Sequence, residues 1–436
     1  MEAINYSAIH SFIDSESSLT RNQHLQEING TSSEDIYSDK NSLWKDNYIN
    51  DSEKVKFLPR ERLITAEEIN EIEVIIHDVL KSGEFTTGKY IPLLQMELSK
   101  FYENKNIICC NSGTTAISVA LLALGVKRGD EVIIPANSFA ATENAILSIG
   151  ATPVLADVSI ETGNLDPQKL IFALSEKTKV IMPVHLYGKL APMMEISQFA
   201  KEHDLFIVED ACQAFGLDDV GKFGDVVAFS FNPYKNLGFC GKSGAILCNN
   251  NILAKRIEEI LYHGFEPGMK NIKSYYWGYN ALIDNLQAAI GLVKLKFFAK
   301  SNLKRLLLAK RYCKELSALS KYGITIPKFL PDNSWHLYPI YFSSKDIRDE
   351  VKKIMLNDFN VETDIYYPVL THKQPPIKSH IRVSIDGVAS TEYLNDRVLH
   401  LPMYPNMPLK DQLKVIESLF ASISNIAKNN LFTVAD

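Results

Sequence analysis

Between Asn106 and Cys248, short apolar runs alternate with segments whose apolar residues recur at helical spacing. Each run is almost continuously apolar, which is typical of strands that are buried on both faces of a sheet. The alternation therefore predicts an α/β fold with a mainly parallel, seven-stranded sheet between layers of helices. The expected strands are Ile107–Cys110, Glu131–Ile134, Thr152–Ala156, Val180–Val184, Leu205–Val208, Val226–Phe231 and Ala245–Cys248.

Helices are expected before and after this alternating region. Thr65 and Glu68 have the spacing of a capping box, and an amphipathic pattern follows them until Gly83. Asp284–Phe297 and Asn302–Leu319 carry the same helical periodicity. The strands are thus enclosed in the sequence by long helices.

The pattern changes from Trp335 onward, where strands and helices no longer alternate regularly. It predicts a smaller α+β domain. Its expected elements are the strands His336–Phe342 and Val361–Tyr367 and the helices Ile347–Phe359, Thr391–Leu399 and Leu409–Ile423. We divide the chain into a polar N-terminal extension (1–56), a large domain (57–305) and a small C-terminal domain (306–436).

Composition narrows the function classes. The chain has 436 residues, of which 46% are hydrophobic and 22% charged, so it can bury a large core. Its net charge of −6 gives no electrostatic reason to expect nucleic acid as a partner. It has no apolar stretch of the roughly 20 residues that a membrane helix needs, and no secretory leader, so we expect a cytoplasmic protein. The spacing of the six cysteines indicates neither disulfides nor a metal site.

Lys235 is the leading candidate for chemistry. It follows the apolar run Val226–Phe231, which Pro233 ends, and Gly238 keeps the chain irregular after it. A lysine held in a partly dry site has a lowered pKa, and its neutral amine can attack a carbonyl to form a Schiff base. Read alone, the segment also fits an ordinary loop lysine. The nearby Cys240–Ser243 is no phosphate-binding loop, because Asn236 stands where that motif needs glycine.

Other candidates also follow expected strands. Ser112–Thr115 opens a helix, so its N–H groups and hydroxyls can bind a phosphate, although a plain helix cap has the same pattern. Phe139 in the run Pro135–Phe139 offers an aromatic face, although taken alone this run favours a core position for it. Asp210 places beside Gln213 a carboxylate that needs a cationic partner. A lysine, an anion site, an aromatic plane and a carboxylate that can pair with a pyridinium nitrogen together indicate pyridoxal 5'-phosphate.

Four runs resemble the DegT/DnrJ/EryC1/StrS family of sugar aminotransferases: Asn111–Ala116, Val208–Ala214, Ser230–Gly238 and Gly278–Asn280 with Asp284–Ala289. The resemblance implies the fold type I of pyridoxal phosphate aminotransferases. It implies Lys235 as the Schiff-base lysine, Asp210 at the pyridinium nitrogen, Gln213 near the ring hydroxyl and Phe139 on the ring face. It also implies phosphate contacts from Gly113, Thr114 and Ser230, and from Asn280 of the other subunit of a homodimer.

Further runs resemble family members that make amino sugars for antibiotics: Pro135–Ala145, Pro183–Lys189, Tyr262–Glu266 and Tyr366–Pro368. They imply transfer of an amino group from glutamate to 3-oxo-glucose 6-phosphate, which gives kanosamine 6-phosphate. The expected contacts to this substrate are Lys242, His263, His372 and Tyr366. A nucleotide-linked keto sugar is the alternative substrate. Elimination or desulfuration on the same cofactor and a non-catalytic regulator remain alternative functions, although Lys235 argues against the regulator.

Overall fold

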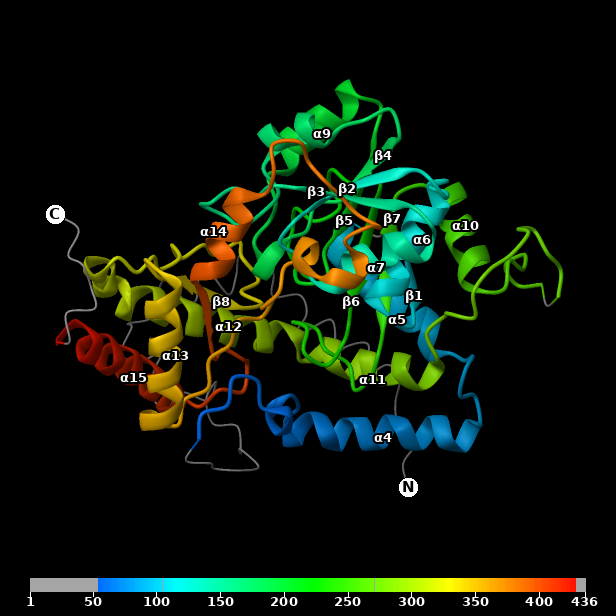
Figure 1. Cartoon of the computed structure of the whole chain (residues 1–436). Helices are drawn as coiled ribbons and strands as arrows, with labels where there is room; N and C mark the ends of the chain where they lie inside the picture. Colours follow the sequence, from blue (N-terminus) through cyan, green and yellow to red (C-terminus); the bar gives the residue numbers. More distant parts are fainter. Residues whose placement is uncertain (1–53, 104, 270, 429–436) are drawn as a thin grey trace.

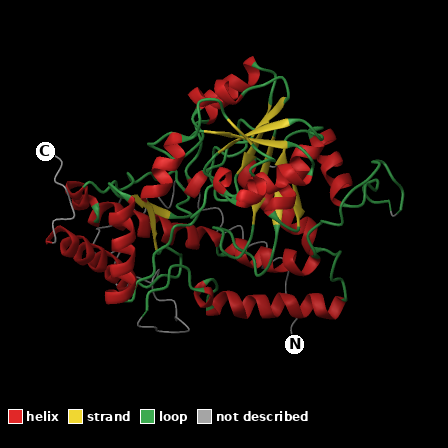
Figure 2. Ribbon diagram, in the orientation of Figure 1, coloured by secondary structure: helices red, strands yellow, loops and turns green. Residues whose placement is uncertain are grey.

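The computed structural model describes residues 54–103, 105–269 and 271–428. The prediction for the N-terminal extension therefore lies almost entirely outside the described residues. Figure 1 shows one large sheet with helices on both sides and a second, smaller group of elements beside it. In Figure 2 the strands of the large sheet gather in one place, and a short second sheet lies among the helices of the smaller group.

The large sheet confirms the predicted mainly parallel arrangement. Its eight strands lie in the order β1-β7-β6-β5-β4-β2-β3-β9, and only β7 runs antiparallel to its neighbours. Seven of them overlap the expected strands, although β4 shares only Val180 and Ile181 with the expected Val180–Val184. They are β1 (Asn106–Cys110), β2 (Glu131–Pro135), β3 (Thr152–Ala156), β4 (Thr178–Ile181), β5 (Phe206–Asp210), β6 (Val226–Ser230) and β7 (Gly244–Cys248).

The eighth strand, β9 (Arg382–Val383), was not predicted and comes from the C-terminal part of the chain. Two residues are too short to give a periodic pattern. A long-range contact holds the strand instead, because Arg382 Nη2 donates to Glu131 Oε2 over 2.7 Å. The edge of the sheet therefore depends on an ion pair that the local sequence does not indicate.

Strand alternation explains why the apolar runs are continuous. On β1, Ile108 and Cys110 face one core, whereas Ile107 and Cys109 face another. The first core is covered by α6 (Gly113–Ala123), α7 (Ala140–Ser148) and α10 (Asn251–Leu261). The second is covered by α4 (Ala66–Ser82), α5 (Tyr90–Ser99) and α11 (Asn285–Lys296), while α8 (Leu170–Ala173) and α9 (Met193–Glu202) cover a third.

The capping box at the start of α4 is confirmed. The Glu68 amide donates to Thr65 Oγ1 over 3.2 Å, and the Thr65 amide donates to Glu68 Oε2 over 2.7 Å. Glu68 also accepts from Lys294 Nζ of α11 over 2.6 Å. The same carboxylate thus caps one helix and anchors it to another.

The smaller group has its own core, built on the antiparallel pair β8 (Tyr338–Tyr341) and β10 (Val398–Leu401). Around it pack α12 (Phe298–Glu315), α13 (Lys345–Phe359), α14 (Ala389–Arg397) and α15 (Leu409–Lys428). Val55 contributes to this core and forms an isolated bridge with Val361. Among the described residues, no helix combines the length and the apolar character that crossing a membrane requires.

Two expectations for this group were wrong. Val361–Tyr367 is not a strand, because only Val361 and Asp364 form isolated bridges and no ladder extends between them. The helix expected at 391–399 ends at Arg397, and Val398 starts β10. The paired strand β8 supplies hydrogen bonds there that a further helical turn would lose.

Candidate functional site

The candidate residues come together at the carboxyl ends of the parallel strands. Asp210 is the last residue of β5, Ser230 the last of β6, and Ser112 lies just beyond β1. β5 and β6 are neighbours in the sheet, with Asp210 opposite Ala228. This edge is where ligands bind in open α/β sheets, and the predicted clustering of these residues is therefore supported by the topology.

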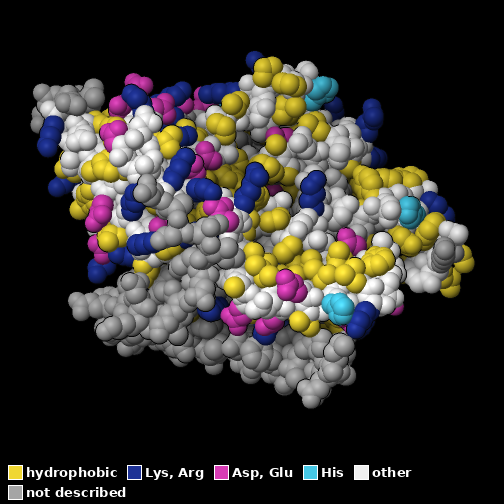
Figure 3. Space-filling view, turned by 90° about the horizontal axis from the view of Figure 1, so that it is seen from below, with side chains coloured by type: hydrophobic (Ala, Val, Ile, Leu, Met, Phe, Trp, Pro, Cys, Tyr) yellow, Lys and Arg dark blue, Asp and Glu magenta, His cyan; other side chains and the backbone are white. Residues whose placement is uncertain are grey.

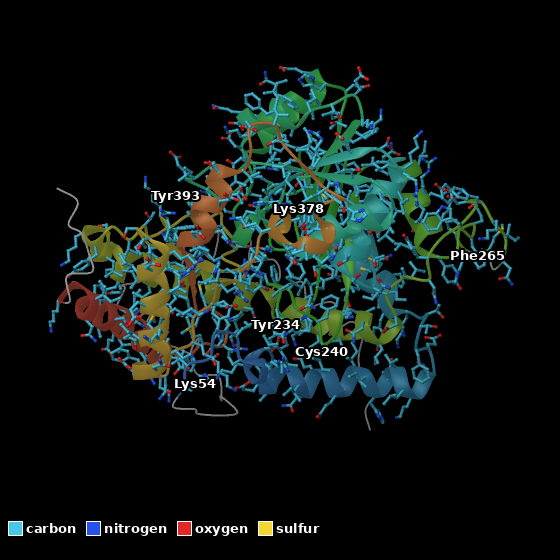
Figure 4. All side chains as sticks on the ribbon, viewed as in Figure 1. Lys54, Tyr234, Cys240, Phe265, Lys378 and Tyr393 are labelled. Atoms are coloured by element: carbon cyan, nitrogen blue, oxygen red, sulfur yellow. The ribbon has the colours of Figure 1, made fainter. Side chains whose placement is uncertain are left out.

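Lys235 sits on a constrained loop between β6 and β7. The loop is closed by bonds from the Phe231 amide to the Ser243 carbonyl (2.8 Å) and from the Phe239 amide to the Phe231 carbonyl (2.9 Å). At Gly238 a Cβ atom would lie only 2.4 Å from the Pro233 carbonyl oxygen, so glycine is needed for this close approach. Figure 4 labels Tyr234 and Cys240 on this loop, between the sheet and α4. These hydrogen bonds and the close approach at Gly238 hold the backbone of the loop that carries Lys235 in one conformation.

The environment of Lys235 favours its neutral form. Burial lowers the pKa of the amine from 10.5, although Cys212 and Asp210 act in the opposite direction. The net effect is a larger fraction of free amine near neutral pH. Such an amine can attack a carbonyl or accept a proton from carbon.

Asp210 is buried and precisely oriented by two hydrogen bonds. Its Oδ2 accepts from Thr142 Oγ1 over 2.9 Å, and its Oδ1 accepts from the Cys212 amide over 3.2 Å. Neither donor carries a positive charge, so the carboxylate can still pair with a cationic ring nitrogen. Thr142 was not predicted as a site residue, because it lies 68 positions from Asp210 in the sequence and gives no local signal.

Helix α6 offers an anion site beside this carboxylate. Ser112 caps the helix, and its Oγ accepts from the Thr115 amide over 3.1 Å. Gly113 is buried against Ser230, where a Cβ on Gly113 would lie 2.7 Å from the Ser230 Cβ. Thr114 is exposed. This small-residue cradle at a helix N-terminus fits a phosphate group, because the first N–H groups of a helix have no intrahelical partner.

Gln213 connects the large sheet to the smaller group of elements. Its Oε1 accepts from the Tyr187 amide over 2.7 Å, and its Nε2 donates to Tyr367 Oη over 2.9 Å. The Tyr367 ring lies nearly parallel to that of Tyr187, with 6.3 Å between the ring centroids, and its centroid also lies 6.3 Å from that of Phe139. Tyr187 and Tyr367 were not predicted as site residues, because both contacts are long-range.

Phe139 is half exposed, with 52% of its surface accessible, and it caps α7 just after β2. Taken alone, the run Pro135–Phe139 favours a core position for Phe139. Exposure excludes the core interpretation. An exposed ring at the edge that carries Asp210 and Lys235 fits an aromatic cofactor.

Two of the four expected substrate contacts come from the smaller group of elements. Burial raises the pKa of Tyr366, and the nearby Asp364 and Tyr234, the latter on the lysine loop, add to this effect. Its ring lies 5.1 Å from that of Tyr367. His372 is bound elsewhere, since its Nε2 lies 2.8 Å from Glu392 Oε1 on α14. A role in substrate binding stays a prediction for both.

The other two lie on loops of the large sheet. Lys242 is exposed on the loop that carries Lys235. His263 begins a long loop after α10, and its ring neighbours, Tyr262 and Phe265, belong to the same loop. Figure 4 shows Phe265 far from the sheet, on a loop that protrudes from the molecule. Asn280, at the end of this loop, is exposed and bridges to Tyr262.

Comparison with known proteins finds similar sequences and structures. The sequence profile of the DegT/DnrJ/EryC1/StrS aminotransferase family matches residues 65–420. The chain is 45% identical to the 3-oxo-glucose-6-phosphate:glutamate aminotransferase of Bacillus subtilis (84% of this chain, 83% of the relative). It is 36% identical to the UDP-2-acetamido-2-deoxy-3-oxo-D-glucuronate aminotransferase of Pseudomonas aeruginosa (77% and 91%). The structure of NtdA from Bacillus subtilis with bound cofactor PMP superposes with a TM-score of 0.86 at 42% identity, covering 93% of both chains.

Proposed function

From the premise that the chain belongs to the DegT/DnrJ/EryC1/StrS aminotransferase family, we propose that it transfers an amino group from glutamate to a 3-oxo-hexose 6-phosphate. The product of 3-oxo-glucose 6-phosphate would be kanosamine 6-phosphate. One observation carries the catalytic part of this proposal: Lys235 lies on the loop that follows β6, next to β5, whose last residue is Asp210, and burial lowers the pKa of its amine.

The enzyme depends on pyridoxal phosphate, as its family does. When bound, this cofactor supplies an electron sink for the carbanion that forms at the substrate carbon. We propose that Asp210 holds the ring nitrogen in its protonated form and that Gln213 contacts the ring hydroxyl. In the same proposal the phosphate lies at the Gly113 cradle, with Thr114 and Ser230, and Phe139 covers one face of the ring.

Lys235 would move the protons of both half-reactions. In the first half its neutral Nζ would take a proton from the α-carbon of glutamate and pass it to the cofactor. In the second half it would take a proton back from the cofactor and deliver it to carbon 3 of the sugar. The lowered pKa supports the first step, because a protonated amine cannot act as a base. The rigid loop between β6 and β7 keeps the amine within reach of both carbons.

The sugar phosphate requires cationic or N–H partners. We propose Lys242 as the main partner, since it is exposed on the loop that carries Lys235, and Tyr366, His263 and His372 as further contacts. The alternative substrate, a nucleotide-linked keto sugar, is favoured by the 36% identity to an aminotransferase named for a UDP-linked sugar. The two substrates differ in the group that this part of the site must bind.

The test compares kcat/KM for the hexose phosphate, its unphosphorylated analogue and a nucleotide-linked keto sugar. Wild type should prefer the hexose phosphate, and Lys242→Ala should lose about tenfold to a hundredfold for this substrate only. Lys222→Ala, which removes another exposed lysine, serves as the control. A preference for the nucleotide-linked sugar, or an equal loss on both hexoses, would support the alternative.

We also propose a cytoplasmic homodimer with shared sites. Exposed apolar side chains support an interface: Val74 and Leu80 on α4, Phe85 beyond it, and Met96 on α5. Figure 3 shows hydrophobic side chains gathered on the face seen from below, where α4 lies. Figure 4 shows that the loop carrying Phe265 protrudes from the molecule, and in this proposal Asn280, at the end of that loop, contacts a partner's cofactor phosphate. The proposed substrates, glutamate and a sugar phosphate, are metabolites of the cytoplasm.

A further inference from the structure

Arg305 of α12 is a buried cation that forms no ion pair with an acidic side chain of the described residues. Only 4% of the residue is exposed, and its Nη1 donates to two carbonyl oxygens, of His336 (3.2 Å) and Met403 (3.3 Å). Its Nε is buried, and no acceptor among the described residues bonds to it. Burial alone lowers the pKa of this guanidinium from 12.5 to about 10. A buried charge without a counter-charge is costly, so the surroundings of this side chain need an explanation.

A small cavity adjoins the guanidinium. It measures about 30 Å³ and lies where the lysine loop, α11, α12 and the start of α4 meet. Its charged lining residues are Arg62, Glu68, Lys235, Lys294 and Arg305. This volume has room for about one or two water molecules or a single small ion, which favours such an occupant over a phosphate group.

The charges around this cavity leave an excess of positive charge. Glu68 accepts from Lys294 Nζ over 2.6 Å, so this pair neutralises itself. Arg62 forms an ion pair with Asp411, with 3.5 Å between Nη1 and Oδ2. The positive charge of Arg305 remains uncompensated, together with that of Lys235 whenever its amine is protonated. Water could satisfy the Arg305 Nε–H but could not balance its charge.

We propose that this cavity binds a small monovalent anion, chloride under ordinary conditions, at the Nε–H of Arg305. Of the residues assigned to the cofactor, Lys235 alone lines the cavity. The site therefore lies behind the catalytic loop and is separate from the cradle at Gly113. It is a structural counter-ion site that supports the loop that carries Lys235.

A short chain of contacts links this site to the lysine. Asn236 Nδ2 donates to the Ser334 carbonyl over 2.7 Å, so its Oδ1 faces His336 Nδ1 at 2.9 Å and the Nδ1 carries the proton. The carbonyl of His336 in turn accepts from Arg305. An anion beside Arg305 would hold this side chain in place and, through it, the segment next to Lys235. Its negative charge would also oppose the lowering of the Lys235 pKa by burial.

The test uses bromide as an anomalous scatterer in crystals of the holoenzyme, together with thermal unfolding in chloride and in gluconate at equal ionic strength. Wild type should show a bromide peak beside Arg305 Nε and a saturable rise of Tm with chloride but not with gluconate. Arg305→Gln should lose both effects. Lys310→Gln, which removes a charge from α12 outside the cavity lining, should keep both.

If Arg305→Gln does not fold, Ser301→Leu provides a second variant, because it fills the cavity and leaves the guanidinium in place. It should also abolish the bromide peak. A wild-type cavity that holds only water in the presence of bromide would overturn the proposal. So would a bromide peak or a chloride-dependent Tm that persists in Arg305→Gln.

Discussion

Thr142 Oγ1 donates a hydrogen bond to Asp210 Oδ2 over 2.9 Å, joining the first turn of α7 to the end of β5. Thr142 Oγ1 in turn lies 2.7 Å from Ser138 Oγ, so the threonine hydroxyl has a second hydrogen-bond partner that fixes its direction. Both Thr142 and Asp210 are buried. The threonine thus orients the carboxylate that we assign to the cofactor's ring nitrogen.

Removing this hydroxyl should weaken cofactor binding without unfolding the protein. Thr142→Val keeps the shape and leaves one carboxylate oxygen without its donor, which should weaken the affinity for pyridoxal phosphate about tenfold. Thr142→Ser should restore most of the loss because it returns the hydroxyl. The measurement is an absorbance titration of the cofactor-free protein, with circular dichroism as a check on the fold. Equal affinities for wild type and Thr142→Val would contradict the positioning role.

The cradle at Gly113 should not tolerate a side chain. In Gly113→Ala the new Cβ would lie 2.7 Å from the Ser230 Cβ at the end of β6, and the strand cannot move away easily. Overpacking of this kind costs about 1–3 kcal/mol, so the affinity for the cofactor phosphate should fall about tenfold or more. Because Ser230 is itself a proposed phosphate contact, the rescue is measured as Tm of the cofactor-free protein, and adding Ser230→Gly should recover part of the lost stability by removing the clash. No recovery of Tm in the double variant would mean that the defect has another cause.

The lowered pKa of Lys235 predicts a pH dependence of stability. A lysine with a depressed folded-state pKa binds fewer protons folded than unfolded, so the cofactor-free protein should gain stability as the pH rises toward 10.5. Lys235→Met removes this contribution. The free energy of unfolding, measured with urea from neutral pH upward, should therefore rise more with pH for wild type than for Lys235→Met. Lys242→Met, at an exposed position, is the control, and a pH-independent difference between wild type and Lys235→Met would contradict the assignment.

Subunit mixing tests the proposed sharing of sites. Lys235→Ala should be inactive, and Asn280→Ala should bind the cofactor poorly. Each mixed dimer would contain one intact site, built from the wild-type lysine of one chain and the wild-type asparagine of the other. Complete random exchange should thus restore about a quarter of the wild-type sites. If mass spectrometry shows that the subunits have exchanged and no activity returns, Asn280 does not complete the partner's site.

The sequence predicted the sheet well because its strands are buried on both faces. Runs such as Val226–Phe231 contain hardly any polar residue, and the polar residue that ends each run marks the site edge. Asp210 was therefore found from its position, whereas Ser230 was named only through the family resemblance. The short strand β9 and the false strand at 361–367 were not predictable in this way, because pairing with distant residues decides both.

The same distinction applies to the site. Lys235, Asp210 and Gly113 have local signals: a strand end, a turn or a helix start. Thr142, Tyr187 and Tyr367 act through contacts to Asp210 or Gln213 that only the folded chain creates. The cavity at Arg305 is equally invisible in the sequence, since an arginine in the amphipathic helix α12 would be expected to face solvent.

The most direct test of the account is to identify the lysine that carries the cofactor. The purified holoenzyme should absorb in the near-visible range, and borohydride reduction followed by proteolysis and mass spectrometry should find the cofactor on the peptide that contains Lys235. Lys235→Ala should give no labelled peptide, and Lys242→Ala should be labelled like wild type. Covalent cofactor on any other lysine of the wild-type protein, or none after reduction, would contradict the assignment of Lys235.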